Sequence, residues 1–434
     1  MFIFVLMELN EFDLIQGEHL AIVGANGSGK SLLVEALRRR RPRQIEYISF
    51  RDTYGDEADG AYYLQLRWNR QELANHIHLE DSAADMFALS SGELRKHRIA
   101  RALQSEAPFL VIDNPYLGLD APSREVFTDT LSSVAACDRR TVILVMPSAA
   151  IMPSFITHVA LVGGGAVEKM SVGEFASRRD SSAASDLPSE RRDAILNLPL
   201  KDLGAVKFYP SQPGAEIVRC NSVSIRYDSR TILDSLDWTV REGERWAVRG
   251  ENGSGKSTLL SLVCADNPQA YACDIALFGH KRGSGESIWD IKRHIGYVSP
   301  EMHRAYQKNI TALEAVASGF FDTVGLYLRA DEKQLELCRK WMWMFGIEGL
   351  AERPYLKLSS GEQRLCLLAR AFVKDPELLI LDEPMHGLDP QNCHTVRQIV
   401  DTFLQRPHKT LLFVTHFDSE LPASIDHTLT LHKH

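Results

Sequence analysis

The clearest hydrophobic pattern is a short apolar run followed by a glycine-rich turn and a helical segment. HLAIVG (19–24) leads into GANGSGKS (24–31), and SLLVEALRRR (31–40) follows with apolar residues at helical spacing. The same layout recurs in RWAVRG (245–250), GENGSGKS (250–257) and STLLSLV (257–263). Because apolar strands alternate with helices in both halves, we expect an α/β fold in each half, with a mostly parallel sheet flanked by helices.

The chain contains an internal repeat with one length difference. The two glycine-rich loops lie 226 residues apart, whereas the LSSGE segments (89–93 and 358–362) and the acids Asp113 and Asp382 lie 269 apart. We therefore expect two homologous domains, the second with 43 more residues between its loop and its LSSGE. The expected boundaries are 1–170 for domain one, 171–215 for a linker largely without a core pattern, and 216–434 for domain two.

The beginnings of the two domains also differ. Domain two has a strand-like segment, IVRCNSVSIRY (217–227), well before its loop. Domain one has only 23 residues before Gly24, and we interpret its apolar start, MFIFVLMEL (1–9), as a strand. Domain one is thus expected to be short at its N-terminus.

Composition and charge narrow the class of protein. A net charge of −8 argues against binding nucleic acid by bulk electrostatics, and no window reaches the 18 apolar residues of a membrane span. Seven scattered cysteines without a CxxC pair fit a reducing compartment, so we expect a cytoplasmic location. RRRRPR (38–43) fits a solvated helix end more simply than an anion-binding patch, and WMWMF (341–345) fits a core.

The two glycine-rich turns match GxxxxGK[ST] in its strand–loop–helix setting. Glycines let backbone N–H groups face the phosphates, the lysine reaches the β- and γ-phosphates, and the last hydroxyl is a ligand for Mg²⁺. The chain should therefore bind ATP with Mg²⁺ twice. The loop residues expected to bind it are Gly24, Asn26, Gly27, Ser28, Gly29, Lys30, Ser31, Gly250, Asn252, Gly253, Ser254, Gly255, Lys256, Ser257 and Thr258.

With LSSGE 24 residues before the acids at 113 and 382, the chain resembles the nucleotide-binding domains of ATP-binding cassette (ABC) proteins. The resemblance implies P-loop NTPase domains with an antiparallel β part and a helical subdomain. Two such domains close head to tail, so a monomer can form the pair. The LSSGE segments match the signature motif of this family. Ser90 and Ser359 of these signatures would contact the γ-phosphate of the ATP bound by the other domain, and Gly92 and Gly361 would allow close approach of the backbone. ALFGHKRGSGESIWDIKRHIGYVS (276–299) and SGFFDTVGLY (318–327) narrow the resemblance to tandem molybdate-transport or photorepair (ModF/PhrA-type) proteins.

The same resemblance assigns Mg²⁺ to Ser31, Asp113, Ser257 and Asp382, and catalysis to Lys256, Asp382, Glu383 and His416. The glutamate after the second acid would orient or deprotonate the attacking water, and the histidine would contact the γ-phosphate. Domain one has Asn114 and Pro147 at these two positions. An amide cannot accept the proton of water at neutral pH, and proline has no donor, so we expect one competent and one degenerate site.

Two further family positions are unusual. Tyr227 fits the adenine-stacking aromatic in domain two, but its counterpart in domain one would be residue 1. Pro300 and Phe50 stand where the family has the glutamine of its Q-loop, which contacts Mg²⁺ and links to a membrane subunit. Glu301 is a candidate substitute in domain two.

Three functions remain open from the sequence. The first is the energy-coupling ATPase of a transport system for molybdate or another anion, bound to separate membrane-spanning subunits on the inner face of a membrane. Against it stand the unusual Q-loops and the reduced helical subdomain of domain one. The second is a soluble ABC ATPase acting on a ribosome or DNA, which the negative charge and the absence of a long charged helical linker disfavour. The third is a nucleotide-state switch that hydrolyses slowly.

Overall fold

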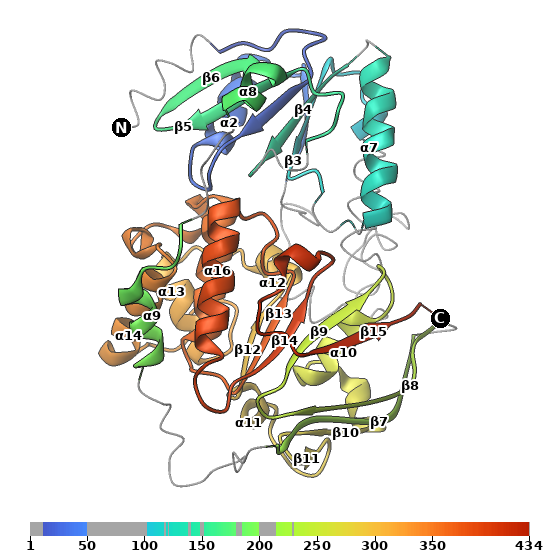
Figure 1. The fold of residues 1–434 in the computed structure, drawn as a ribbon, viewed down its shortest axis with the longest axis vertical. Helices are drawn as coiled ribbons and strands as arrows, with labels where there is room; N and C mark the ends of the chain where they lie inside the picture. Colours follow the sequence, from blue (N-terminus) through green and yellow to red (C-terminus); the bar gives the residue numbers. More distant parts are fainter. Residues whose placement is uncertain are drawn as a thin grey trace.

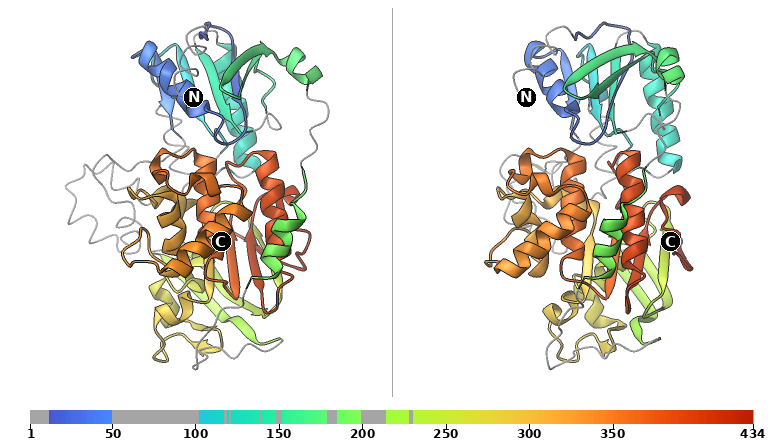
Figure 2. Two further views of the ribbon diagram at one scale, coloured as in Figure 1. Left: turned by 90° about the vertical axis from the view of Figure 1, so that its left-hand side faces the viewer. Right: turned by 60° about the vertical axis from the view of Figure 1, so that its left-hand side comes forward.

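The computed structural model describes residues 12–49, 102–116, 119, 121–137, 140–147, 152–178, 185–198, 214–227 and 230–433. The apolar start at 1–9, Phe50 and the first LSSGE at 89–93 lie outside these residues. In the described part, no helix has both the length and the apolar character needed to cross a membrane. Figures 1 and 2 show two α/β units stacked along the longest axis of the molecule.

Domain one is built on a six-stranded sheet in the order β2-β3-β4-β1-β5-β6. All neighbouring strands pair in parallel except β5 and β6, which are antiparallel. Its strands are β1 (Leu20–Val23), β2 (Ile45–Ile48), β3 (Phe109–Asp113), β4 (Thr141–Met146), β5 (His158–Gly163) and β6 (Ala166–Ser171). Its described helices are α2 (Lys30–Arg40), α7 (Ala121–Ala136) and α8 (Val172–Arg178).

Domain two repeats this order in a five-stranded parallel sheet, β12-β13-β14-β9-β15. A second, antiparallel sheet has the order β11-β10-β7-β8. The strands are β7 (Glu216–Tyr227), β8 (Arg230–Arg241), β9 (Arg245–Gly250), β10 (Asp274–Leu277), β11 (His280–Lys281), β12 (Ile295–Val298), β13 (Leu378–Asp382), β14 (Thr410–Val414) and β15 (His427–Leu431).

The helices of domain two pack mainly around the parallel sheet. They are α10 (Lys256–Val263), α11 (Ile288–Lys292), α12 (Pro300–Ala305), α13 (Ala312–Ala317), α14 (Glu332–Met344), α15 (Ser360–Phe372) and α16 (Pro390–Phe403). Short 3₁₀ turns are η2 (Pro268–Ala272), η3 (Ser318–Phe320), η4 (Glu348–Leu350), η5 (Tyr355–Lys357) and η6 (Asp418–Glu420). The α/β fold with an added antiparallel sheet is thus confirmed, and α13 and α14 lie to one side of the sheet (Figure 1).

The interiors of the central strands β3, β4, β13 and β14 are apolar at consecutive positions because both faces of the sheet are covered. Along β13, Leu379 and Leu381 pack into one core, whereas Leu378 and Ile380 pack into the core on the other face. In domain one, the residues of β3 divide between two cores in the same way. This burial fixes where each strand ends, and therefore where the acidic residues that follow it emerge.

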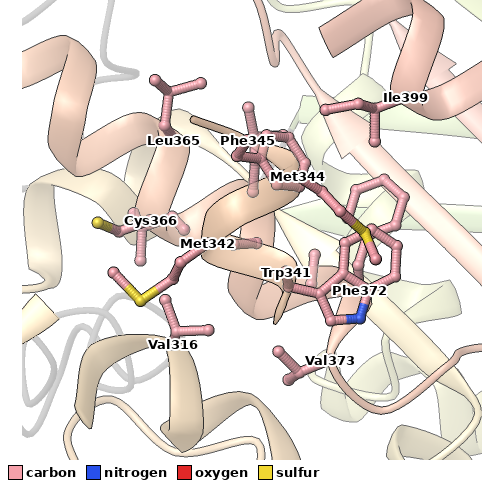
Figure 3. Packing of buried hydrophobic residues seen from close by; sticks show 14 of the residues in the cluster. Val316, Trp341, Met342, Met344, Phe345, Leu365, Cys366, Phe372, Val373 and Ile399 are labelled. Carbon is pink, nitrogen blue, oxygen red and sulfur yellow. The ribbon is translucent and has the colours of Figure 1, made fainter. Parts of the chain in front are cut away.

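The segment WMWMF is core, as the sequence analysis favoured. Trp341, Met342 and Met344 of α14 are at most 1% exposed. The Trp341 ring lies 4.9 Å from that of Phe372 on α15 (Figure 3). It lies 6.1 Å from the ring of Phe403 on α16. The aromatic cluster therefore ties the helical part of domain two to the helices that cover its sheet.

The segment between the domains is more structured than expected. Helix α8 packs on the core of domain one, and a second helix, α9 (Ser189–Leu196), packs on domain two against α14 and α16. Leu187, Ile195 and Leu198 are buried in the core of domain two. The expectation of a linker largely without a core pattern is therefore wrong for residues 187–198. The few apolar residues of this segment are buried in the core of domain two.

Candidate functional site

Both glycine-rich loops fold in the same way, between a buried strand and a helix. Gly29 and Gly255 have φ of 104° and 96°, a conformation that glycine adopts without strain, and a helix begins at the following lysine. Lys30 Nζ donates to Gly24 O (2.6 Å) and Ala25 O (2.8 Å). Lys256 Nζ donates to Gly250 O (2.6 Å) and Glu251 O (2.9 Å). Each lysine thus closes its loop into a ring at a helix N-terminus, an arrangement suited to an anion.

The hydroxyls of the loops fall into two groups. The Ser28 and Ser254 Oγ atoms are buried and have no hydrogen-bond partner among the described residues. Ser31 and Ser257, in the first turns of α2 and α10, are exposed. The second pair is thus accessible at the mouth of each loop, where a Mg²⁺ ligand is expected.

Glu383 follows β13 directly and is held by side chains from three directions. Its Oε2 is 3.0 Å from His386 Nδ1, and its Oε1 is 3.3 Å from His416 Nε2. Burial alone would raise the pKa of Glu383, but the hydrogen bonds and charges of His386 and His416 hold that pKa well below its ordinary value. The buried guanidinium of Arg364 on α15 donates to the carbonyls of Asp382 (3.0 Å) and Glu383. This carboxylate is therefore ionised and fixed in orientation.

Asp382 lies in a strongly acidic environment. Burial raises its pKa well above the ordinary value, and the charges of Glu301 and Glu383 raise it further. Glu301 stands in the first turn of α12, where Ser299 caps the helix and Pro300 begins it. Several carboxylates around one buried acid fit a divalent cation, which would neutralise this excess of negative charge. No group of three or more His, Cys, Asp or Glu side chains in the described residues is placed to hold a metal ion, so these carboxylates supply negative charge around Asp382 and not a complete Mg²⁺ shell.

Asn114 occupies in domain one the position that Glu383 has in domain two. Both residues have φ of 48°, and both backbone N–H groups donate over 2.9 Å to the neighbouring strand, at Val145 O and Val414 O. Asp113 Oδ2 accepts from Tyr47 Oη at 3.3 Å. The backbone of the two sites is therefore alike, and the difference lies in the side chains.

The loop of domain one contacts the second LSSGE across the domain boundary. The Asn26 N–H donates to Asp389 Oδ2 at 2.8 Å. A Cβ on Gly361 would lie 1.9 Å from Asn26 Nδ2, so any larger residue there would displace the Asn26 side chain. Burial lowers the pKa of Lys30 to about 8, against the opposing charges of Asp113, Asp389 and Glu362. These are contacts that a head-to-tail pair requires.

The second LSSGE begins a helix at this boundary. Ser359 caps α15 by accepting from Glu362 N at 3.3 Å, while the Glu362 carboxylate accepts from Ser359 N at 2.8 Å. The Ser359 side-chain oxygen thus lies at the N-terminus of α15, which faces domain one. Ser90 and Gly92, the corresponding residues expected to face the loop of domain two, lie outside the described residues.

Near the loop of domain two lie the predicted Tyr227 and further residues that carry no motif. Tyr227 ends β7, and its Oη accepts from Asn267 Nδ2 at 3.0 Å. His386, Arg364 and Arg230 carry no motif in the sequence. The Arg230 guanidinium lies 3.1 Å from where a Cβ on Gly253 would stand. His386 differs from its counterpart in the repeat, Leu117, but a single histidine in a sequence does not indicate which side chain it contacts.

The fold, the paired loops and the contact between loop and signature define a nucleotide-binding cassette. The chain belongs to the ABC transporter family, whose profile matches residues 8–72 and 233–386, one segment in each half. The ABC transporter ATP-binding protein ModF of Escherichia coli is 35% identical, over 98% of this chain and 93% of that protein. An uncharacterized ABC transporter ATP-binding protein of Schizosaccharomyces pombe is 30% identical, over 88% and 77%.

A solved structure also resembles part of the chain. It is a nucleotide-free ATP-binding cassette from an ABC transporter, 20% identical, with a TM-score of 0.42 over 50% of this chain and 88% of that one.

Proposed function

We propose that this tandem ABC protein has two composite sites, each formed by the phosphate loop of one domain and the LSSGE segment of the other. It hydrolyses ATP at one of these sites and holds ATP without turnover at the other. The observation that carries the proposal is the pair Glu383 and Asn114, which share one backbone conformation but differ in chemistry. Glu383 is an ionised acid held by two imidazoles, whereas an amide stands in its place in domain one. Domain two therefore supplies the base that hydrolysis needs.

In the competent site the residues of domain two have separate tasks. Lys256 and the N–H groups of its loop would bind the phosphates, and Glu383 would orient the attacking water and accept its proton. His416 would face the γ-phosphate while holding Glu383. Mg²⁺ bound near Ser257 and Asp382 would neutralise the phosphate charge. The signature of domain one, with Ser90 and Gly92, would complete this site.

In the degenerate site the binding parts persist. Lys30 and the loop around it fold as in domain two, and Ser31 and Asp113 would bind Mg²⁺. Asn114 can hold a water but cannot take its proton, and Pro147 cannot replace the histidine. ATP bound there would act as a bridge to the signature of domain two, with Ser359 and Gly361 facing it.

The test compares the two lysines. We expect Lys256→Ala to lower steady-state phosphate release at least 100-fold, because the phosphate charge loses its partner. Lys30→Ala should retain hydrolysis but lose the ATP that remains bound after rapid gel filtration. Equal loss of hydrolysis in both variants, or a wild-type protein without phosphate release, would contradict the proposal.

We further propose that this ATPase acts with separate membrane-spanning subunits. Support comes from the resemblance to ModF, which is described as an ABC transporter ATP-binding protein, and from the large helical part of domain two that could receive such a subunit. Capture of the tagged chain from detergent-solubilised membranes, compared with co-sedimentation with ribosomes, separates this proposal from a ribosomal role. Retention by ribosomes alone would contradict it.

A further inference from the structure

Helix α7 of domain one carries an arginine into the neighbourhood of the proposed catalytic site of domain two. The Arg124 guanidinium lies 4.4 Å from the ring centroid of Phe417 in domain two and 5.1 Å from that of Tyr116 in domain one. Its Nε atom is buried and has no hydrogen-bond partner in the described part of the chain. The side chain is thus held between two aromatic rings, one from each domain, at cation–π distance.

The ring in domain two belongs to the segment that positions His416. Phe417 follows His416 directly, and its N–H donates to Thr415 Oγ1 at 3.1 Å. The Thr415 hydroxyl in turn donates to the Glu420 carboxylate at the end of η6. Residues 415–420 therefore form one hydrogen-bonded loop, and Arg124 packs on it from the other domain. A shift of this loop would move His416, whose imidazole holds Glu383.

The charge around this loop also favours a cation. Glu420 and Glu383 both attract the Arg124 guanidinium electrostatically. Burial raises the pKa of Glu420 and the negative charge of Glu383 raises it further, while the charge of Arg124 opposes this rise. Domain one thus supplies a positive charge to an acidic region of domain two.

The contact belongs to only one of the two composite sites. At the repeat offset of 269 residues, the counterpart of Arg124 is Cys393 and that of Phe417 is Ser148. Cys393 contacts Met385 O and Leu388 O, 3.7 Å away in each case and within domain two. The arginine–aromatic pair is therefore specific to the site that contains Glu383 and His416.

We propose that Arg124 is a positioning residue supplied in trans: it holds the His416 loop and offsets the acidity around Glu383 only when the two domains are packed together. Hydrolysis in domain two would then depend on closure with domain one. This inference rests on the proposed function, because it assigns Arg124 to the site that hydrolyses ATP.

The experiment measures kcat and KM for MgATP in the full chain and in three variants. We expect Arg124→Ala to lower kcat about tenfold while KM changes less than about twofold. The lost cation–π and charge interactions act on the His416 loop (residues 415–420) and not on the loop that binds the phosphates. Arg124→Lys keeps the charge but stacks less well, so it should recover part of kcat. The matched control, Cys393→Ser, should stay within about twofold of wild type. Unchanged kcat in Arg124→Ala, or an equal loss in the control, would overturn the inference.

A second measurement does not depend on turnover. The midpoints of thermal unfolding without nucleotide are compared for Arg124→Ala, Phe417→Ala and the double variant. If the midpoint of the double variant is no lower than that of the less stable single variant, the two side chains are coupled and the contact is supported. Strictly additive shifts would overturn it. A wild type that fails to hydrolyse ATP while the shifts stay coupled would refute the proposed function and leave the domain contact standing.

Discussion

Replacing Glu383 by glutamine isolates the base from the geometry that surrounds it. Glutamine keeps the length of the side chain and one oxygen, which can retain one of the two contacts now made to His386 and His416. It cannot accept a proton from water, so the whole contribution of a general base is lost. We expect kcat to fall about 1,000-fold, equivalent to about 4 kcal/mol of activation free energy.

The structure also gives the expected effects on binding and pH. Glu383 does not belong to the phosphate loop, so KM for MgATP should change less than about threefold. Because the pKa of Glu383 lies well below its ordinary value, the carboxylate stays ionised above that value. Its contribution to activity and stability is lost only as pH falls through the lowered pKa, so Glu383 should impose no loss of rate between about pH 5 and 8.

The assay is steady-state phosphate release from MgATP, with Asn114→Ala as the matched variant. Asn114 has the same φ but carries no base, so its replacement should change kcat less than about twofold. Alanine tolerates a positive φ less well, and a stability loss of about 1 kcal/mol is expected. Equal loss of kcat in the two variants, or more than a tenth of the wild-type rate in Glu383→Gln, would refute the assignment of catalysis to domain two.

Three further predictions concern the boundary, the core and the first loop. Gly361→Ala places a Cβ 1.9 Å from a side-chain amide of domain one, so the midpoint of thermal unfolding should fall by several degrees, whereas Gly349→Ala, which meets nothing within 4 Å, should not change it. Trp341→Ala should cost about 3–5 kcal/mol in denaturant unfolding of domain two, and replacement of the half-exposed Trp289 should cost less than about 1 kcal/mol. Burial lowers the pKa of Lys30 to about 8. ATP binding should therefore take up a proton at pH 9 and none at pH 6.5, as calorimetry in two buffers can measure. Equal proton uptake at both pH values would contradict this.

The comparison of sequence and structure shows why some residues were foreseen and others were not. The loops around Lys30 and Lys256 were predictable because a phosphate loop is local: its glycines, lysine and helix start all lie within eight residues. Arg364 acts on carbonyls 18 and 19 residues away, and Arg124 acts on a ring of the other domain. His386 stands only three residues from Glu383, but the turn between them decides whether the two side chains meet. Their roles follow from packing, and packing leaves no spacing signal in the chain.

The sequence alone determined that the chain has two related α/β domains, where their phosphate loops and acids stand, and which half has an amide, Asn114, where the other has the acid Glu383. These conclusions depend on local spacing and on side-chain chemistry, which are properties of the chain itself. Only the tertiary structure decided that Asn26 meets Asp389 and Gly361, that two imidazoles hold Glu383, and that Arg124 reaches the His416 loop. Such contacts arise when buried strands and helices fix distant side chains in one place, and the free energy of that burial is shared among residues throughout both domains.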